Sequence, residues 1–411
     1  MTEAAAAPSP MRVPAFVALM GYRILTILSY QIVSVAVGWQ IYQLTRDPLK
    51  LGLVGLAEVI PYFCVAPFAG YLVDHLPRRK LGMVACLGLA LTPLVLALVS
   101  MRLRAGSPLV FMYGAVALTG AVRSFLGPVY NALFGRVLVR EQYTRGASIG
   151  SIVFQSGLVL GPAIGGALVG AGSIVVAYAV AMALAFAASL SVVSLRVTEP
   201  AQQMQRGPIF RSIGEGIRFV FSHQILLGAL ALDMFAVLFG GAISLAPAFI
   251  HDVLHRGPEA LGILRGAPAL GAVLVGVYLA RRPLERHAGR ILLCAVAGFG
   301  LCMIGFGLST SFWLSAAILL LSGMCDGVSV VLRSTILQLA TPDDMRGRVS
   351  SINGIFIGSS NELGAFWSGA MARLMGLVPS VVFGGFMTLA VVASTGWRAP
   401  KLRRLDLREL R

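Results

Sequence analysis

The chain has 411 residues, a formal net charge of +16 and a mean hydropathy of +0.84; 57% of its residues are hydrophobic and only 12% are charged. Soluble domains carry about 25% charged residues, so a chain this apolar cannot cover itself with polar surface and must have lipid as part of its solvent. These values exclude an ordinary soluble enzyme. They predict an all-α membrane protein, because the short alternating segments of barrel strands are not seen.

The first segment, residues 1–14, is rich in Ala and Pro and is predicted to be a short cytoplasmic tail. It does not show a small-residue cleavage site behind a short apolar core, so a signal peptide is not expected here.

Twelve apolar segments follow, each near the roughly 20 residues that a membrane-spanning helix needs. Polar breaks rich in charge, Pro and Gly separate them. The predicted spans are 15–44, 51–73, 80–100, 108–135, 147–170, 174–195, 224–250, 259–280, 290–310, 312–338, 350–374 and 379–397.

The Lys and Arg residues fall mainly on alternate breaks between these spans. With the N-terminus inside, the inside breaks and tails hold 23 Lys and Arg and the outside breaks hold 5. Cytoplasmic loops of membrane proteins carry such an excess. The asymmetry predicts that both termini are cytoplasmic, which requires an even number of spans. It also explains the positive charge better than nucleic-acid binding does.

The longest break divides the spans six and six. It alternates Ile and Phe with Arg211, Glu215 and Arg218, which suits an amphipathic helix on the inner membrane surface; a plain linker also accounts for it. The predicted domains are a tail (1–14), a six-helix bundle (15–195), the linker (196–223), a second six-helix bundle (224–397) and a basic cytoplasmic tail (398–411).

An internal repeat supports this division. Leu51-Gly52-Leu53-Val54 recurs as Leu261-Gly262-Ile263-Leu264, and residues 141–149 resemble residues 344–352. Duplicated halves around a central site are the usual plan of secondary transporters.

The break after the second span resembles a loop signature of the major facilitator superfamily, Gly-x-x-x-Asp-Arg-x-Gly-Arg-Arg/Lys. His75 and Pro77 depart from that signature. The matching residues are Gly70, Asp74, Arg78 and Arg79.

The fifth span looks like the antiporter signature of the same superfamily, Gly-x-x-x-Gly-Pro-x-x-Gly-Gly, although Ser148 stands where a further glycine is expected. Small residues on one helix face let a neighbouring helix approach closely, so generic packing explains them as well as antiport does. The matching residues are Gly157, Gly161, Pro162, Gly165 and Gly166.

Most of the chain is similar to the bacterial enterobactin-exporter and macrolide-efflux branch of this superfamily, especially at 213–221 and 337–354. The resemblance implies two six-helix bundles and a central cavity lined by spans one, four, seven and ten. It also implies a cytoplasmic latch in which Asp74 meets the N-terminal end of span eleven. The predicted latch residues are Gly70, Asp74, Arg78, Arg79, Arg136 and Arg140; topology alone also accounts for the arginines.

Seven ionisable residues lie at membrane depth, where each costs at least about 2.5–3.5 kcal/mol unless it is paired or hydrated. Asp233 and Asp326 are the predicted proton-carrying groups, with Glu58 as a third candidate, and Arg23 and Arg123 are predicted modulators or substrate contacts. A permanent ion pair is the alternative for any one of them. The seven are Arg23, Glu58, Arg123, Asp233, Asp326, Arg333 and Glu362.

The sequence therefore predicts a proton-coupled exporter of small amphipathic molecules, such as a drug, a siderophore or a similar metabolite, in the bacterial inner membrane. An importer or facilitator of a small metabolite is the alternative, and a sensor or membrane enzyme is a third. Zinc-protease and Walker motifs are absent from the sequence. We expect no enzyme activity, cofactor, metal or nucleic acid; the expected partners are a substrate, protons and lipids, and the expected state is a monomer.

Overall fold

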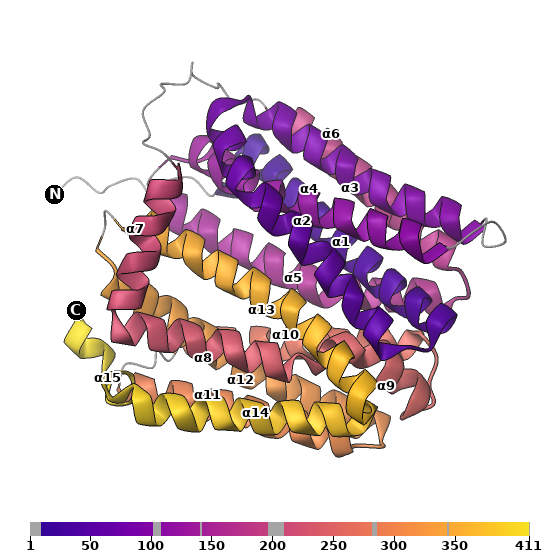
Figure 1. Ribbon diagram of the computed structural model, residues 1–411. Coiled ribbons are helices and arrows are strands. Elements are labelled where there is room, and N and C mark those ends of the chain that lie inside the picture. Colours follow the sequence, from indigo (N-terminus) through magenta and orange to yellow (C-terminus); the bar gives the residue numbers. More distant parts are fainter. Residues whose placement is uncertain are drawn as a thin grey trace. The chain divides into compact units, whose positions relative to one another are not determined.

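The computed structural model describes residues 10–101, 108–139, 142–195, 209–281, 286–342 and 345–410. These residues form helices joined by turns, and no strand occurs among them, which confirms the all-α class (Figure 1). The long helices are α1 (Pro14–Thr45), α2 (Pro48–His75), α3 (Arg78–Met101), α4 (Pro108–Val137), α5 (Tyr143–Gly170), α6 (Ile174–Val193), α8 (Gln224–Gly240), α10 (Glu259–Arg281), α11 (Ala288–Leu308), α12 (Phe312–Ala340), α13 (Arg346–Met375) and α14 (Leu377–Arg398). The short ones are η1 (Pro10–Arg12), α7 (Ile209–Ser222), η3 (Ala242–Leu245), α9 (Ala246–Asp252), α15 (Pro400–Arg403) and η4 (Leu407–Leu410).

Eleven helical segments in the described part of the chain are long and apolar enough to cross a membrane. The predicted span 350–374 falls on α13, which has 30 residues but is not among the eleven. Polar residues such as Asn353, Asn361 and Glu362 interrupt its apolar run. The count of twelve spans and the cytoplasmic side of both termini therefore stay predictions.

The predicted span 224–250 is broken rather than continuous. Helix α8 ends at Gly240, and η3 and α9 follow it. The pair Gly240–Gly241 has low helix propensity, and α13 and α14 pack closely against the end of α8. A Cβ atom on Gly384 of α14 would lie 2.2 Å from the Phe239 carbonyl oxygen, and one on Gly364 of α13 would lie 2.9 Å from the Val237 carbonyl oxygen. Glycines on α13 and α14 thus allow close packing against the last turn of α8.

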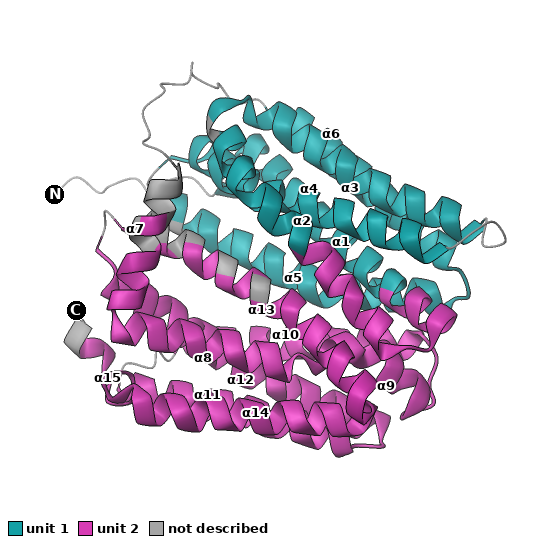
Figure 2. Ribbon diagram, viewed as in Figure 1, with its two compact units in different colours: residues 1–37, 60–205 teal, residues 38–59, 206–411 magenta. Residues whose placement is uncertain are grey.

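The helices form two compact units, which Figure 2 colours separately. Unit 1 comprises residues 1–37 and 60–205, and unit 2 comprises residues 38–59 and 206–411. The hairpin made by the end of α1 and the start of α2 (residues 38–59) therefore packs as a part of unit 2. The predicted bundle 15–195 did not separate residues 38–59 from the rest of its helices. The predicted domain boundaries remain a prediction.

In unit 1, α3 packs against α4 and α6. Glycines of the span-five motif bring α5 onto α1: Cβ atoms on Gly157 and Gly161 would lie 2.6 Å from Ile27 Cγ2 and 2.4 Å from Gln31 Cβ. Gly165 repeats this one turn later against Val35. The structure thus shows these glycines in close helix packing.

In unit 2, α11 packs against α12 and α14, which repeats the grouping of α3 with α4 and α6. Helix α10 packs on α12, while α8 packs on α13 and α14. Helix α7, at the position of the predicted amphipathic helix, packs on α8 and α13 with Val220 buried and Ile217 and Phe221 exposed. Its place on the membrane surface stays a prediction.

Candidate functional site

A buried pair of opposite charges in unit 2 joins two of its helices. Arg333 of α12 forms an ion pair with Asp233 of α8, and both side chains are at most 10% exposed. The two residues lie a hundred positions apart in the sequence, so only the packing of α8 on α12 brings them together. A buried pair of this kind offsets the desolvation of each partner by attraction, and removal of one partner leaves the other uncompensated.

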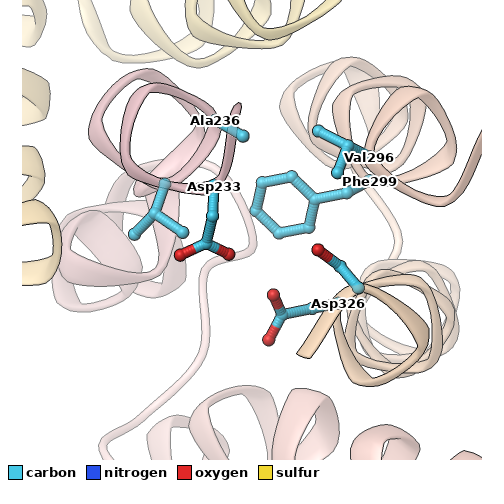
Figure 3. A pocket seen from close by; sticks show the side chains of 7 residues that line it. Asp233, Ala236, Val296, Phe299 and Asp326 are labelled. Atoms are coloured by element: carbon cyan, nitrogen blue, oxygen red, sulfur yellow. The ribbon is translucent and has the colours of Figure 1, made fainter. Parts of the chain in front are cut away.

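Asp326 lies two turns before Arg333 on α12, beside the same pair. Figure 3 shows Asp233, Asp326 and Phe299, which come from α8, α12 and α11, around one small pocket. The pocket has room for about one water molecule. It is lined by Asp233, Ala236, Val237, Val296, Phe299, Asp326 and Ser329.

Ser329 adds an unused hydrogen-bonding group to this pocket. Its hydroxyl is buried and has no hydrogen-bond partner among the described residues. A serine hydroxyl can donate one hydrogen bond and accept two. It can therefore bond either to a water molecule in the pocket or to a carboxyl group. Ser329 and Phe299 were not predicted as site residues, since uncharged residues of these types are common in apolar spans.

The predicted residues of unit 1 lie in a different setting. The guanidinium carbon of Arg23 lies 3.9 Å from the centroid of the Tyr130 ring and 5.1 Å from that of Phe154. Arg123 lies 4.1 Å above the Tyr30 ring, and its Nη1 donates a hydrogen bond of 2.8 Å to the Tyr30 hydroxyl. Aromatic faces attract such cations electrostatically.

Glu58 and Glu362 lie on α2 and α13, which meet within unit 2. The helices are in backbone contact there: a Cβ atom on Gly55 would lie 2.5 Å from the Glu362 carbonyl oxygen, and one on Gly369 would lie 2.7 Å from the Gly52 Cα. Glu58 is buried and Glu362 is partly buried. The structure therefore places both acids at a tight helix contact.

A polar cluster that the sequence did not predict holds the hairpin 38–59 in unit 2. The Tyr42 hydroxyl donates to Asp252, and Arg46 contacts the ring of His251. Asp47 adds a looser ion pair with Arg373 at 3.9 Å. The first two contacts join residues 210 and 205 positions apart in the chain, and the partners of the ion pair, Asp47 and Arg373, lie still further apart.

The predicted latch is only partly described. Gly70 lies in the last two turns of α2, where a Cβ atom would meet no other group. Arg136 is exposed at the end of α4. Arg79 donates a hydrogen bond to the Val193 carbonyl at the end of α6. Arg78 begins α3. Arg140 and the side chain of Asp74 lie outside the described part of the chain. The latch therefore stays a prediction.

Long apolar helices that bury charged residues are typical of multi-pass transporters, in which such residues mark ion and substrate pathways. The sequence model of the Major Facilitator Superfamily matches residues 19–365. The chain belongs to this family, as its loop and span-five motifs suggested.

The chain is also similar to individual proteins, among them an exporter and two transporters of known structure. The enterobactin exporter EntS of Escherichia coli is 27% identical over 393 residues, which cover 92% of this chain and 90% of EntS. A bacterial homolog of the human lysosomal transporter Spinster has a TM-score of 0.72 at 14% identity and covers 98% of both chains. A D-xylose–proton symporter has a TM-score of 0.71 at 11% identity and covers 96% of this chain and 98% of its own. At these identities the two structures share only the fold with this chain.

Proposed function

We propose that this protein is a proton-coupled exporter of small amphipathic molecules that works by alternating access across the bacterial inner membrane. One observation carries the proposal: a buried Asp233–Arg333 ion pair with a second carboxylate, Asp326, at the same small pocket. Ionisable groups are costly in a membrane and are found there chiefly where they do work.

The charge count of this pocket explains why it would take up a proton. The three helices that line it carry four charged side chains, and three of them, Asp233, Asp326 and Arg333, belong to the pair and its neighbour. The fourth, Arg290, begins α11. With both carboxylates ionised, the set has one excess negative charge in an apolar region, so the uptake of one proton neutralises it. Release follows when solvent reaches the pocket from the other face.

The same proposal takes α13 as the twelfth span. Its 30 residues correspond to about 45 Å of helix, more than the roughly 30 Å hydrocarbon core requires. The helix packs against α8 and α14, so part of its surface is covered by protein. Both termini are then cytoplasmic, the bundles are residues 15–195 and 224–397, and the linker 196–223 lies at the inner surface. A closed cytoplasmic latch involves Asp74 and the neighbouring arginines.

Export is proposed because the EntS relative, which is itself an exporter, matches along almost the whole chain. The fold does not decide the direction, since a symporter has it too. Import or facilitated movement of a small metabolite is therefore the second candidate. We propose a monomer that needs lipid and protons and no other cofactor.

Proteoliposomes with an imposed pH gradient test the proposal. Ethidium, a cation, and fluorescein, an anion, serve as amphipathic probes. We expect at least one probe to move against the proton flow, and we expect Asp233→Asn and Asp326→Asn to abolish this movement. Glu259→Gln, which changes an exposed carboxylate on α10, is the matched control and should keep it. Movement in the same direction as protons, or movement indifferent to the gradient, would contradict export and favour the second candidate.

A further inference from the structure

The hydroxyl of Ser329 differs from those of other serines on the long helices of unit 2. A serine inside a helix commonly donates a hydrogen bond to the carbonyl three or four residues earlier. Ser322 donates to the Leu319 carbonyl at 2.7 Å, and Ser360 donates to the Ile357 carbonyl at 3.0 Å. Ser329 is only 2% exposed, and its hydroxyl has no hydrogen-bond partner among the described residues. An unpaired hydroxyl at this degree of burial is costly, so a ligand in the pocket that it lines is expected to bond to it.

Ser329 lies between the two charged residues of α12. Asp326 precedes it by three residues and Arg333 follows it by four, so the three residues share one face of the helix. Along the helix axis, Ser329 lies about 4.5 Å from Asp326 and about 6 Å from Arg333. Because Arg333 is paired with Asp233 of α8, this face of α12 is the one that brings the charged residues of the two helices together.

The pocket beside Ser329 has the size and the polar groups that a single water molecule needs. Figure 3 shows the side chains of Asp233 and Asp326 directed toward one another from α8 and α12, with Phe299 of α11 beside them. The space admits about one water molecule, and a buried water makes about three hydrogen bonds. Two carboxyl groups and one hydroxyl supply three partners, while the remaining four lining side chains are apolar.

We infer that the pocket binds one water molecule between Asp233 and Asp326, and that Ser329 is the positioning residue that holds it there. The inference rests on the proposed proton coupling at this site, and it names the group through which the two carboxyls share the proton. The charge count agrees, since one proton on this set of two carboxylates and one guanidinium leaves it neutral.

A hydroxyl suits this position because it both donates and accepts hydrogen bonds. With both carboxylates ionised, the water donates one hydrogen bond to each of them and accepts one from Ser329. After one carboxylate takes up a proton, its O–H donates to the water, and the water donates to the other carboxylate and to the Ser329 oxygen. One proton is bound in this step and the water is not consumed. Release of the proton reverses it.

Two variants of nearly the same shape test this role in the proteoliposome assay with ethidium and fluorescein. Ser329→Thr retains a hydroxyl, whereas Ser329→Val has a methyl group in its place. We expect Ser329→Val to reduce the initial rate of proton-driven movement about tenfold, as for a buried hydrogen bond that is lost, and Ser329→Thr to keep most of the rate. Ser322→Ala is the matched control and should keep the full rate, since this buried serine of the same helix bonds to the Leu319 carbonyl.

A smaller side chain keeps the test valid if the branched ones disturb the helix contact. Ser329→Ala removes the hydroxyl and leaves room for water at the two carboxyl groups, so the rate should fall severalfold and stay above that of Ser329→Val. Equal rates for the Thr and Val variants, or a full rate for the Ala variant, would overturn the inference.

The water itself is tested by crystal structures of the full-length protein at a resolution that shows ordered water. In the unmodified protein we expect one water peak within hydrogen-bond distance of Ser329, Asp233 and Asp326. In the Ser329→Val variant we expect no peak there. A pocket without this water in the unmodified protein, or a peak with the short contacts of a metal cation, would overturn the inference.

The two experiments separate this inference from the proposed function. A water peak bonded to Ser329, without proton-driven movement of either probe, would contradict proton coupling and leave the water site standing. Proton-driven movement that is equal in the Thr and Val variants would support coupling and overturn the role of Ser329.

Discussion

The two units treat buried charge in opposite ways. In unit 1, Arg23 and Arg123 stack on aromatic rings. In unit 2, Arg333 is paired with Asp233, and Asp326 adds a further negative charge. The helix packing is repeated, since α3, α4 and α6 group as α11, α12 and α14 do, but the chemistry placed on it is not.

This difference suggests a division of work between the halves of a duplicated fold. An arginine stacked on rings keeps its positive charge, whereas an excess of carboxylate over cation can take up a proton. In our proposal, the carboxylates of unit 2 respond to the proton gradient. Substitutions in the two units should therefore change stability with opposite signs.

The largest effect is expected from Asp233→Asn. It leaves Arg333 buried without its ion-pair partner, which costs about 3–5 kcal/mol. The thermal unfolding midpoint of the detergent-solubilised protein should fall clearly. The double variant with Arg333→Gln should recover much of that loss. An unchanged midpoint in the single variant would show that the pair contributes nothing to stability.

Arg23→Met should have the opposite sign. The substitution removes a charge worth about 2.5–3.5 kcal/mol of insertion cost, and it loses a ring interaction of about 0.5–2 kcal/mol. We expect the unfolding midpoint to rise by the equivalent of about 1 kcal/mol. A fall as large as that of Asp233→Asn would mean that Arg23 has a structural partner, and the contrast between the units would fail.

Asp326→Asn should separate coupling from stability. The Asp233–Arg333 pair stays intact, so the unfolding free energy should change by no more than about 1 kcal/mol. Proton-driven transport in proteoliposomes should be lost all the same. Full transport by this variant would assign the proton to Asp233 or to a group elsewhere.

The smallest effect is expected from Tyr42→Phe at the hairpin 38–59. It removes the hydrogen bond to Asp252, whose side chain is 43% exposed, so the loss should be about 1 kcal/mol. Tyr278→Phe, at an exposed tyrosine of α10, provides the control for loss of a hydroxyl alone. Equal midpoints in the two variants would show that this bond does not hold the hairpin in unit 2.

Much of the fold followed from hydropathy, because a long apolar run in lipid has to be a helix. Two departures had local causes. Helix α13 carries Asn353, Asn361 and Glu362 within its apolar run, and it is not among the segments that are apolar enough to cross a membrane. The helix of the predicted span 224–250 is interrupted at Gly240–Gly241; the glycine pair was visible in the sequence, but the close packing of α13 and α14 against the end of α8 was not.

The candidate site was less predictable. Depth in a span marked Asp233, Asp326 and Arg333 as costly residues, but their pairing depends on tertiary packing. The spacing of Arg23 to Tyr30 and of Arg123 to Tyr130 could have been read from the sequence. The contacts themselves depend on the packing of α1 against α4, which places each arginine on the tyrosine of the other helix. The contact of Tyr42 with Asp252 gives no local signal at all.

The hairpin 38–59 has a mechanical consequence. The two helices that pass from unit 1 into this hairpin differ in stiffness. Helix α1 has no proline after its first residue, and it joins Tyr42 to Arg23 by about 28 Å of unbroken hydrogen-bonded backbone. Helix α2 contains Pro61 just beyond the boundary of the unit, and Pro67 further on, and each removes a hydrogen bond from the helix. Bending is therefore expected to be easier in α2, next to the hairpin, than in α1 between Tyr42 and Arg23.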